Sequence, residues 1–242
     1  MRHQLNQANT IYFFLITFFL LSSCRQPESL TLSRSETLSG NWKMQPVDRL
    51  KGIDDQLISV NNFDTKDWYE AVVPGTVLGS LATKKVIEDP TFGINMKNVD
   101  TMQFKQPWWY RTTFKLNGTD LKKNISLRFN GINYRADMWI NGKKVAGKEL
   151  FAGTYRMYSF NINAFVLDGE NTLALKLSQF ADGEYSLGFC DWNPLPSDRS
   201  MGIFRDVFLD VNDGIKIRSP FVYSKVDTAT KNRPIYIFRL KL

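Results

Sequence analysis

The chain has 242 residues, a formal net charge of +7, two cysteines and a single histidine, His3. With no other histidine, it cannot build a Ser-His-Asp triad, a Cys-His pair or a histidine-bearing zinc site beyond its N-terminus. The phosphate-binding patterns GxxxxGK[ST] and GxGxxG are missing, so we expect no cofactor and no metal. Lysines and arginines are scattered in ones and twos, which indicates a solvated surface rather than a nucleic-acid partner.

Residues 1–23 have the composition of an export signal. Arg2 precedes an almost wholly apolar run from Ile11 to Leu21, which is shorter than the roughly 20 apolar residues of a spanning helix. Cleavage after Ser23 is therefore favoured over a transmembrane helix. The removed segment holds one arginine and no acid, so the charge falls from +7 to +6.

The motif that follows is similar to the lipobox of bacterial lipoproteins, and it consists of Leu21-Ser22-Ser23-Cys24. The resemblance implies that Cys24 becomes the first mature residue and carries acyl chains that bind a membrane. Residues 24–35 then form a polar tether, and Cys190 has no partner for an intramolecular disulfide. We expect an exported, membrane-anchored lipoprotein, either periplasmic or on the cell surface.

Residues 36–212 show the period-2 alternation of half-buried antiparallel strands. It is clearest in 125–129 and 132–140, and each of the Asn-Gly pairs at 130–131 and 141–142 predicts a tight turn. Only Val77, Leu78 and Leu81 suggest a helical turn. The pattern predicts an all-β fold, a sandwich or jelly roll.

Two stretches do not alternate, 88–108 and 179–202, and loops of this length are usually functional. The second stretch also contains Phe189 and Trp192. Its acids outnumber its one cation, Arg199, and they are Asp182, Glu184, Asp191 and Asp198. Beyond it, residues 213–242 have the pattern of the first strands of another β domain, too few to complete one.

Five motifs, in order, resemble the N-terminal sugar-binding domain of glycoside hydrolase family 2. They are Leu38-Ser39-Gly40-Asn41-Trp42; Trp68 with Val73-Pro74-Gly75-Thr76; Trp109-Tyr110-Arg111; Phe129-Asn130-Gly131 with Ala136-Asp137-Met138-Trp139-Ile140-Asn141-Gly142; and Gly202-Ile203-Phe204-Arg205-Asp206-Val207. The resemblance implies a galactose-binding-like jelly-roll β-sandwich over 36–212 and the start of an immunoglobulin-like sandwich over 213–242. The tryptophans at 42, 68, 109 and 139 are expected to be core residues.

The motifs Asp191-Trp192-Asn193-Pro194 and Pro196-Ser197-Asp198-Arg199-Ser200-Met201-Gly202 are most similar to the exo-β-D-glucosaminidase branch, followed by the β-mannosidases. The resemblance implies that Asp191 and Trp192 contact the sugar, and Asp198 is a further candidate. An acidic, aromatic loop suits the ammonium and ring of glucosamine. In the alternative interpretation both residues are structural: Trp192 packs beneath the loop and Asp191 caps a turn.

Members of this family cleave with two glutamates about 5 Å apart in a TIM barrel of ~250 residues. The resemblance places that barrel after two further β domains, so we expect this chain to be a truncated part that is inactive alone. Two other hypotheses remain open: a non-catalytic glycan-binding surface lipoprotein, and a purely structural or adhesive sandwich.

Overall fold

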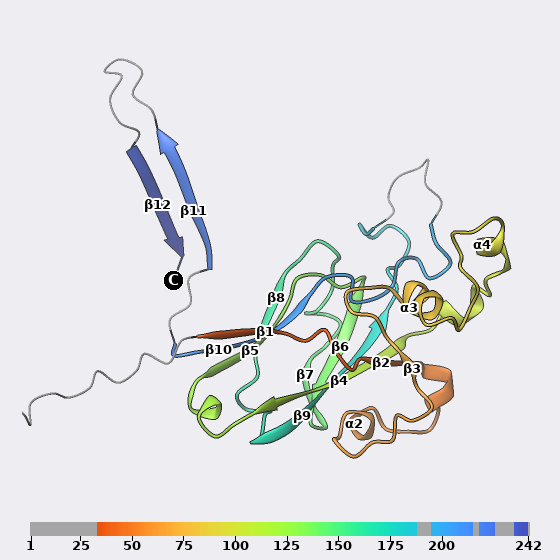
Figure 1. Cartoon of the computed structure of the whole chain (residues 1–242), viewed down its shortest axis with the longest axis horizontal. Coiled ribbons are helices and arrows are strands. Elements are labelled where there is room, and N and C mark those ends of the chain that lie inside the picture. The colour runs from red at the N-terminus through yellow and green to blue at the C-terminus, as the bar shows by residue number, and fades with distance from the viewer. Residues whose placement is uncertain (1–32, 188–194, 215–217, 226–234, 242) are drawn as a thin grey trace, which may run out of the picture. The chain divides into compact units, whose positions relative to one another are not determined.

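The computed structural model describes residues 33–187, 195–214, 218–225 and 235–241 (Figure 1). The predicted export signal, Cys24 and most of the predicted tether lie outside these residues, as do Cys190, Asp191 and Trp192. Within them, two antiparallel sheets face each other across one main core. This confirms the predicted all-β sandwich.

One sheet has four strands in the order β1-β10-β5-β8. They are β1 (Arg34–Thr37), β10 (Val207–Asn212), β5 (Asn124–Phe129) and β8 (Tyr158–Asn161). β1 begins two residues inside the predicted tether, because Arg34 lies opposite Val211 in the ladder and its guanidinium lies 3.2 Å from the carboxylate of Asp120.

The other sheet has six strands in the order β3-β2-β4-β9-β6-β7. They are β3 (Tyr69–Glu70), β2 (Lys43–Pro46), β4 (Trp108–Leu116), β9 (Gly169–Ser178), β6 (Arg135–Ile140) and β7 (Lys143–Ala146). Asn141 and Gly142 join β6 to β7 with φ angles of 49° and 81°. A two-residue hairpin turn of type I′ needs two positive φ angles, so the tight turn predicted here is confirmed.

The tight turn predicted at Asn130-Gly131 is wrong. β5 and β6 belong to different sheets, and the chain crosses between them here instead of folding back into a hairpin. The backbone N–H of Asn130 donates to the carbonyl of Asp206 at 3.1 Å, and a Cβ atom on Gly131 would lie 2.8 Å from Cζ of Phe204. The alternation of apolar and polar residues continues from β5 into β6 because both strands face the same core.

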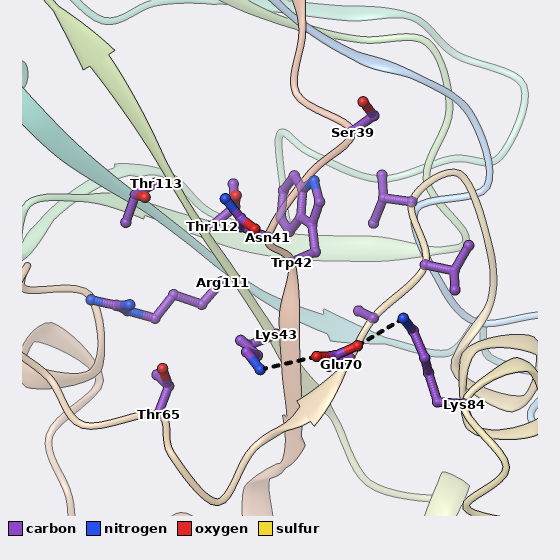
Figure 2. A pocket seen from close by; sticks show the side chains of 13 residues that line it. Ser39, Asn41, Trp42, Lys43, Thr65, Glu70, Lys84, Arg111, Thr112 and Thr113 are labelled. Atoms are coloured by element: carbon purple, nitrogen blue, oxygen red, sulfur yellow. Dashed lines mark ion pairs between the residues drawn. The ribbon is translucent and has the colours of Figure 1, made fainter.

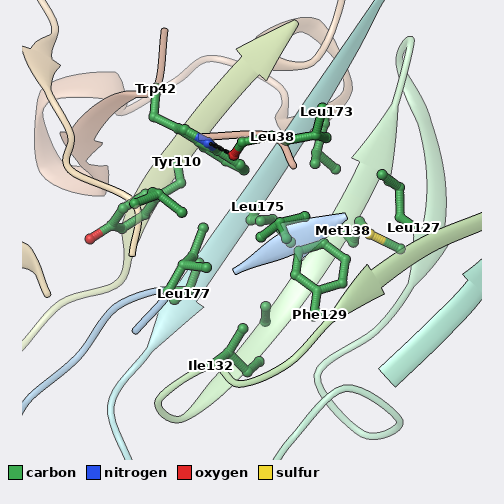
Figure 3. Packing of buried hydrophobic residues seen from close by; sticks show 14 of the residues in the cluster. Leu38, Trp42, Tyr110, Leu127, Phe129, Ile132, Met138, Leu173, Leu175 and Leu177 are labelled. Atoms are coloured by element: carbon green, nitrogen blue, oxygen red, sulfur yellow. Dashed lines mark hydrogen bonds between the residues drawn. The ribbon is translucent and has the colours of Figure 1, made fainter. Parts of the chain in front are cut away.

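The main core fills the space between the sheets (Figure 3). Leu127 and Phe129 enter it from β5, and Met138, Leu173 and Leu175 enter from β6 and β9, all with no exposed surface. Full burial of such side chains stabilises the fold by about 1.5–3 kcal/mol each.

A second apolar cluster covers part of the outer face of the six-stranded sheet. Segment 47–68, with η1 (Val47–Leu50) and α2 (Asp55–Ile58), packs there on Trp109 and Trp139, whose ring centroids are 5.0 Å apart. All four tryptophans expected in the core are buried, and they are Trp42, Trp68, Trp109 and Trp139.

The remaining short helices are α3 (Val77–Thr83), α4 (Asn95–Asn98), η2 (Met102–Phe104) and η3 (Asp120–Lys122). α3 confirms the predicted helical turn, and the Thr76 hydroxyl caps it by accepting from the backbone N–H of Gly79 at 3.0 Å. None of the helices in the described part of the chain is long and apolar enough to cross a bilayer.

Beyond the sandwich, β11 (Arg218–Lys225) and β12 (Ile235–Lys241) form an antiparallel pair. Strands were predicted in this part of the chain, and their presence is confirmed. That they open an immunoglobulin-like domain stays a prediction.

Candidate functional site

The candidate site is the long connection between β9 and β10, residues 179–206. The structure describes it on both sides of residues 188–194, which contain the predicted sugar contacts Asp191 and Trp192. Those two predictions therefore lie outside the described residues. The described parts show how the two ends of this connection are held.

Asp198, the third predicted site residue, is completely buried. Its Oδ2 atom accepts a hydrogen bond from the backbone N–H of Leu78 at 2.8 Å, and its Oδ1 atom accepts from Ser200 at 2.9 Å. Burial raises the pKa of this carboxyl above its ordinary value, although these amide donors act to lower it. The carboxylate thus holds the connection against the first turn of α3, which favours a positioning role over direct contact with a sugar.

Asn133, which sequence reasoning did not single out, ties the same segment to the start of β6. Its side chain has no exposed surface, and its Nδ2 atom donates to the carbonyls of Arg199 at 3.0 Å and Ser200 at 2.9 Å. Its Oδ1 atom accepts from the hydroxyl of Thr154 at 2.6 Å. The only sequence signal was a polar residue between two motifs, since its partners are 66 and 67 residues away.

Backbone hydrogen bonds also hold the C-terminal part of the connection against the segment that precedes and begins α3. The N–H of Gly75 donates to the carbonyl of Ile203, and that of Val77 donates to Met201, both at 2.8 Å. A Cβ atom on Gly202 would lie 2.4 Å from the carbonyl oxygen of Gly75. The Val73-Pro74-Gly75-Thr76 motif therefore supports the connection.

The other end of the connection, residues 179–187, is held by the carboxylate of Glu184. One oxygen of Glu184 accepts from the backbone N–H of Ala181 at 2.5 Å, and the other pairs with Arg135 of β6. Asp182 pairs with Arg199 at 2.9 Å across the connection. The acid excess read from the sequence is thus partly neutralised, and the pairing with Arg135 was missed because Arg135 is distant in sequence.

A polar depression of ≈ 690 Å³ lies elsewhere, beside β2, β3 and β4 (Figure 2). Its lining is mainly hydroxyl, amide and charged groups, with Glu70 between Lys43 at 3.7 Å and Lys84 at 2.7 Å. The two lysines lower the pKa of Glu70. Asp198 is not among its lining residues, so this hollow is separate from the connection between β9 and β10.

Among the residues that the structure describes, no three His, Cys, Asp or Glu side chains gather as metal ligands would.

These features define a galactose-binding-like β-sandwich with an anchored loop. The family model described as "Glycosyl hydrolase 2 galactose-binding domain-like" matches residues 56–184. The chain belongs to glycoside hydrolase family 2, and the resemblance drawn from its motifs is confirmed.

Among curated proteins, the chain is 37% identical over 177 residues to the exo-β-D-glucosaminidase of Amycolatopsis orientalis, an alignment that covers 73% of this chain and 17% of that protein. It is 31% identical over 176 residues to the mannosylglycoprotein endo-β-mannosidase of Lilium longiflorum, covering 62% and 18%. The chain thus spans about one fifth of the length of such relatives.

Among solved structures, the exo-chitosanase CsxA of Amycolatopsis orientalis superposes with a TM-score of 0.74 at 33% identity, covering 81% of this chain and 23% of that one. The β-D-mannosidase of Dictyoglomus thermophilum gives 0.61 at 24% identity, covering 80% and 24%, and supports the fold alone. The sandwich is thus the N-terminal domain type of these glycosidases.

Proposed function

We propose that this chain is the N-terminal carbohydrate-binding part of a glycosidase that hydrolyses β-glucosaminides or β-mannosides. The observation that carries the proposal is its 37% identity to an exo-β-D-glucosaminidase over 177 residues, together with the anchored connection. The two catalytic glutamates belong, in this proposal, to a barrel in a longer protein, and the chain alone is inactive.

Asp191 and Trp192 are the proposed sugar contacts. A carboxylate can pair with the ammonium of glucosamine, and an indole face can stack on a pyranose ring or attract the cation. The connection that carries them is fixed at Glu184 on one side and at Asp198 on the other. Fixed ends reduce the ordering cost of binding, which is the general benefit of a preorganised site.

Export and membrane attachment form part of the same proposal. We place the protein at a membrane surface through acylated Cys24, on the strength of the apolar run 11–21 and the Leu21-Ser22-Ser23-Cys24 motif. Metabolic labelling with a radioactive fatty acid tests this, because Cys24→Ala should abolish incorporation and Cys190→Ala should leave it unchanged.

Titration calorimetry of the chain with glucosamine and mannose tests the binding role. Asp191→Ala should weaken glucosamine binding more than mannose binding, because only glucosamine carries an ammonium, and Trp192→Ala should weaken both. Asp48→Ala removes an exposed acid of η1 and should change neither. If the unaltered chain binds neither sugar, the carbohydrate-binding proposal is wrong and an adhesive sandwich is favoured.

Sequencing the locus beyond the codon for Leu242, with assay of the complete product on chromogenic β-glucosaminide and β-mannoside, tests the enzymatic part. Hydrolysis that depends on the continuing reading frame supports the proposal. Sugar binding with no downstream barrel would instead favour a non-catalytic glycan-binding lipoprotein.

A further inference from the structure

Two exposed tyrosines from separate segments meet beside the anchored connection. Tyr155 lies between β7 and β8, and Tyr185 lies in the part of the connection that follows β9. Their ring centroids are 5.7 Å apart with planes inclined at 49°. Although they are in contact, 53% of Tyr155 and 66% of Tyr185 remain exposed.

Each ring is attached to a fixed point of the backbone. Tyr155 follows Thr154, which is buried and donates to Oδ1 of Asn133 at 2.6 Å. Tyr185 follows Glu184, whose carboxylate is held by the N–H of Ala181 and by Arg135. The pair is therefore presented on a rigid frame, and little further order is lost when a ligand covers it.

The same network of hydrogen bonds links Tyr155 to the described C-terminal part of the connection. The amide of Asn133, which holds Thr154 through its oxygen, holds the carbonyls of Arg199 and Ser200 through its nitrogen. Tyr155 is thus linked to the C-terminal end of the connection, while Tyr185 is part of its N-terminal end. The pair thus connects the described N-terminal part of the connection with the residues that anchor its C-terminal part.

The chemistry of the pair suits a sugar chain. Two inclined ring faces offer apolar contact to a sugar ring, and an aromatic face attracts a cation such as a protonated amino group. The neighbouring carboxylates of Asp182 and Glu184 are paired with Arg199 and Arg135, so the two ring faces, and not a net negative charge, supply the attraction.

We propose that Tyr155 and Tyr185 form an aromatic binding site for the further units of a β-linked amino-sugar oligomer. This inference rests on the proposed function, because it takes Asp191 and Trp192 as the contacts of the first sugar. The pair then contributes to the affinity for oligomers and not to that for the single sugar.

The test compares glucosamine with its β-1,4-linked tetramer by titration calorimetry on the chain. The tetramer should bind more tightly than the monomer, and Tyr155→Ala or Tyr185→Ala should each weaken tetramer binding about fivefold while leaving the monomer unchanged. Tyr155→Phe and Tyr185→Phe keep the ring and should retain most of the tetramer affinity. Thermal unfolding of each variant checks that the fold is intact.

Leu150→Ala is the matched control, because Leu150 is 73% exposed in the segment that carries Tyr155 and has no ring. An equal loss from Leu150→Ala overturns the proposal in favour of a general apolar contact surface. Equal affinities for monomer and tetramer, or unchanged tetramer binding in both Ala variants, also overturn it while leaving the proposed function intact. If the unaltered chain does not bind the monomer, the proposed function itself is contradicted.

Discussion

The Oδ2 atom of Asp198 lies 2.8 Å from the backbone nitrogen of Leu78, 120 residues earlier in the chain. This hydrogen bond joins the first turn of α3 to the connection that follows β9. Asp198 is fully buried and also accepts from the backbone N–H of Ser200. Its carboxylate therefore links the two segments through backbone N–H donors.

Replacing Asp198 by alanine should destabilise the fold by about 2–4 kcal/mol, because the buried backbone N–H of Leu78 and the partly buried N–H of Ser200 lose their acceptor. Asp198→Asn keeps one side-chain oxygen for Leu78 and should cost less. Urea unfolding of both variants measures the difference. Equal stabilities of the alanine variant and the unaltered chain would show that the buried carboxylate is not needed.

The stability contributed by Asp198 should depend on pH. Burial raises the pKa of its carboxyl in the folded state above the ordinary value of 3.8. Between 3.8 and that raised pKa the folded state binds more protons than the unfolded state, so the free energy of unfolding rises as pH falls through this window. The stability of the unaltered chain relative to Asp198→Asn should therefore increase on acidification, and an unchanged or decreasing difference would contradict the assignment.

Asn133→Ala should destabilise the fold by about 2–3 kcal/mol, because it removes the partner of two carbonyls and of the Thr154 hydroxyl. The matched variant is Asn130→Ala, a half-buried asparagine three residues away that interacts with Arg128 at 3.1 Å. It should cost less than 1 kcal/mol. Denaturant midpoints compare the two, and similar losses would argue against a special role for Asn133.

Gly202→Ala should destabilise by about 3 kcal/mol or more, because its Cβ would lie 2.4 Å from the carbonyl oxygen of Gly75 and 2.6 Å from Cα of Thr76. Backbone atoms cannot move aside as a flexible side chain can. Gly40→Ala is the control, since a Cβ there meets nothing within 4 Å. Thermal unfolding distinguishes them; a melting temperature unchanged by Gly202→Ala would refute the close approach.

Lys176→Ala should destabilise by about 1–2 kcal/mol, because the ammonium lies 5.3 Å from the Trp109 ring centroid and 5.8 Å from that of Trp139 while pairing with Asp55. Lys144→Ala removes a more exposed ammonium, 5.3 Å from Trp139 alone, and should cost less. Unfolding in high salt should reduce both effects. The reverse order of stabilities would contradict the importance of the two-indole contact.

The strands and their inward faces could be predicted from sequence, because period-2 alternation and turn residues are local signals. The alternation of Leu173, Leu175 and Leu177 and the turn at Asn141-Gly142 both appear in the structure as expected. The same signals failed at Asn130-Gly131, since a turn into a hairpin and a crossing between two sheets have similar local sequences.

The features of the candidate site are also of two kinds, those that local sequence predicts and those that the fold creates. The all-β class, the family motifs and the place of the long acidic connection could be predicted, because all three follow from neighbouring residues. The burial of Asp198 against α3, the pairing of Arg135 with Glu184 and the contact of Tyr155 with Tyr185 are visible only in the folded chain. These contacts join residues 30 or more positions apart, and such pairings depend on how the two sheets pack, which no local pattern encodes.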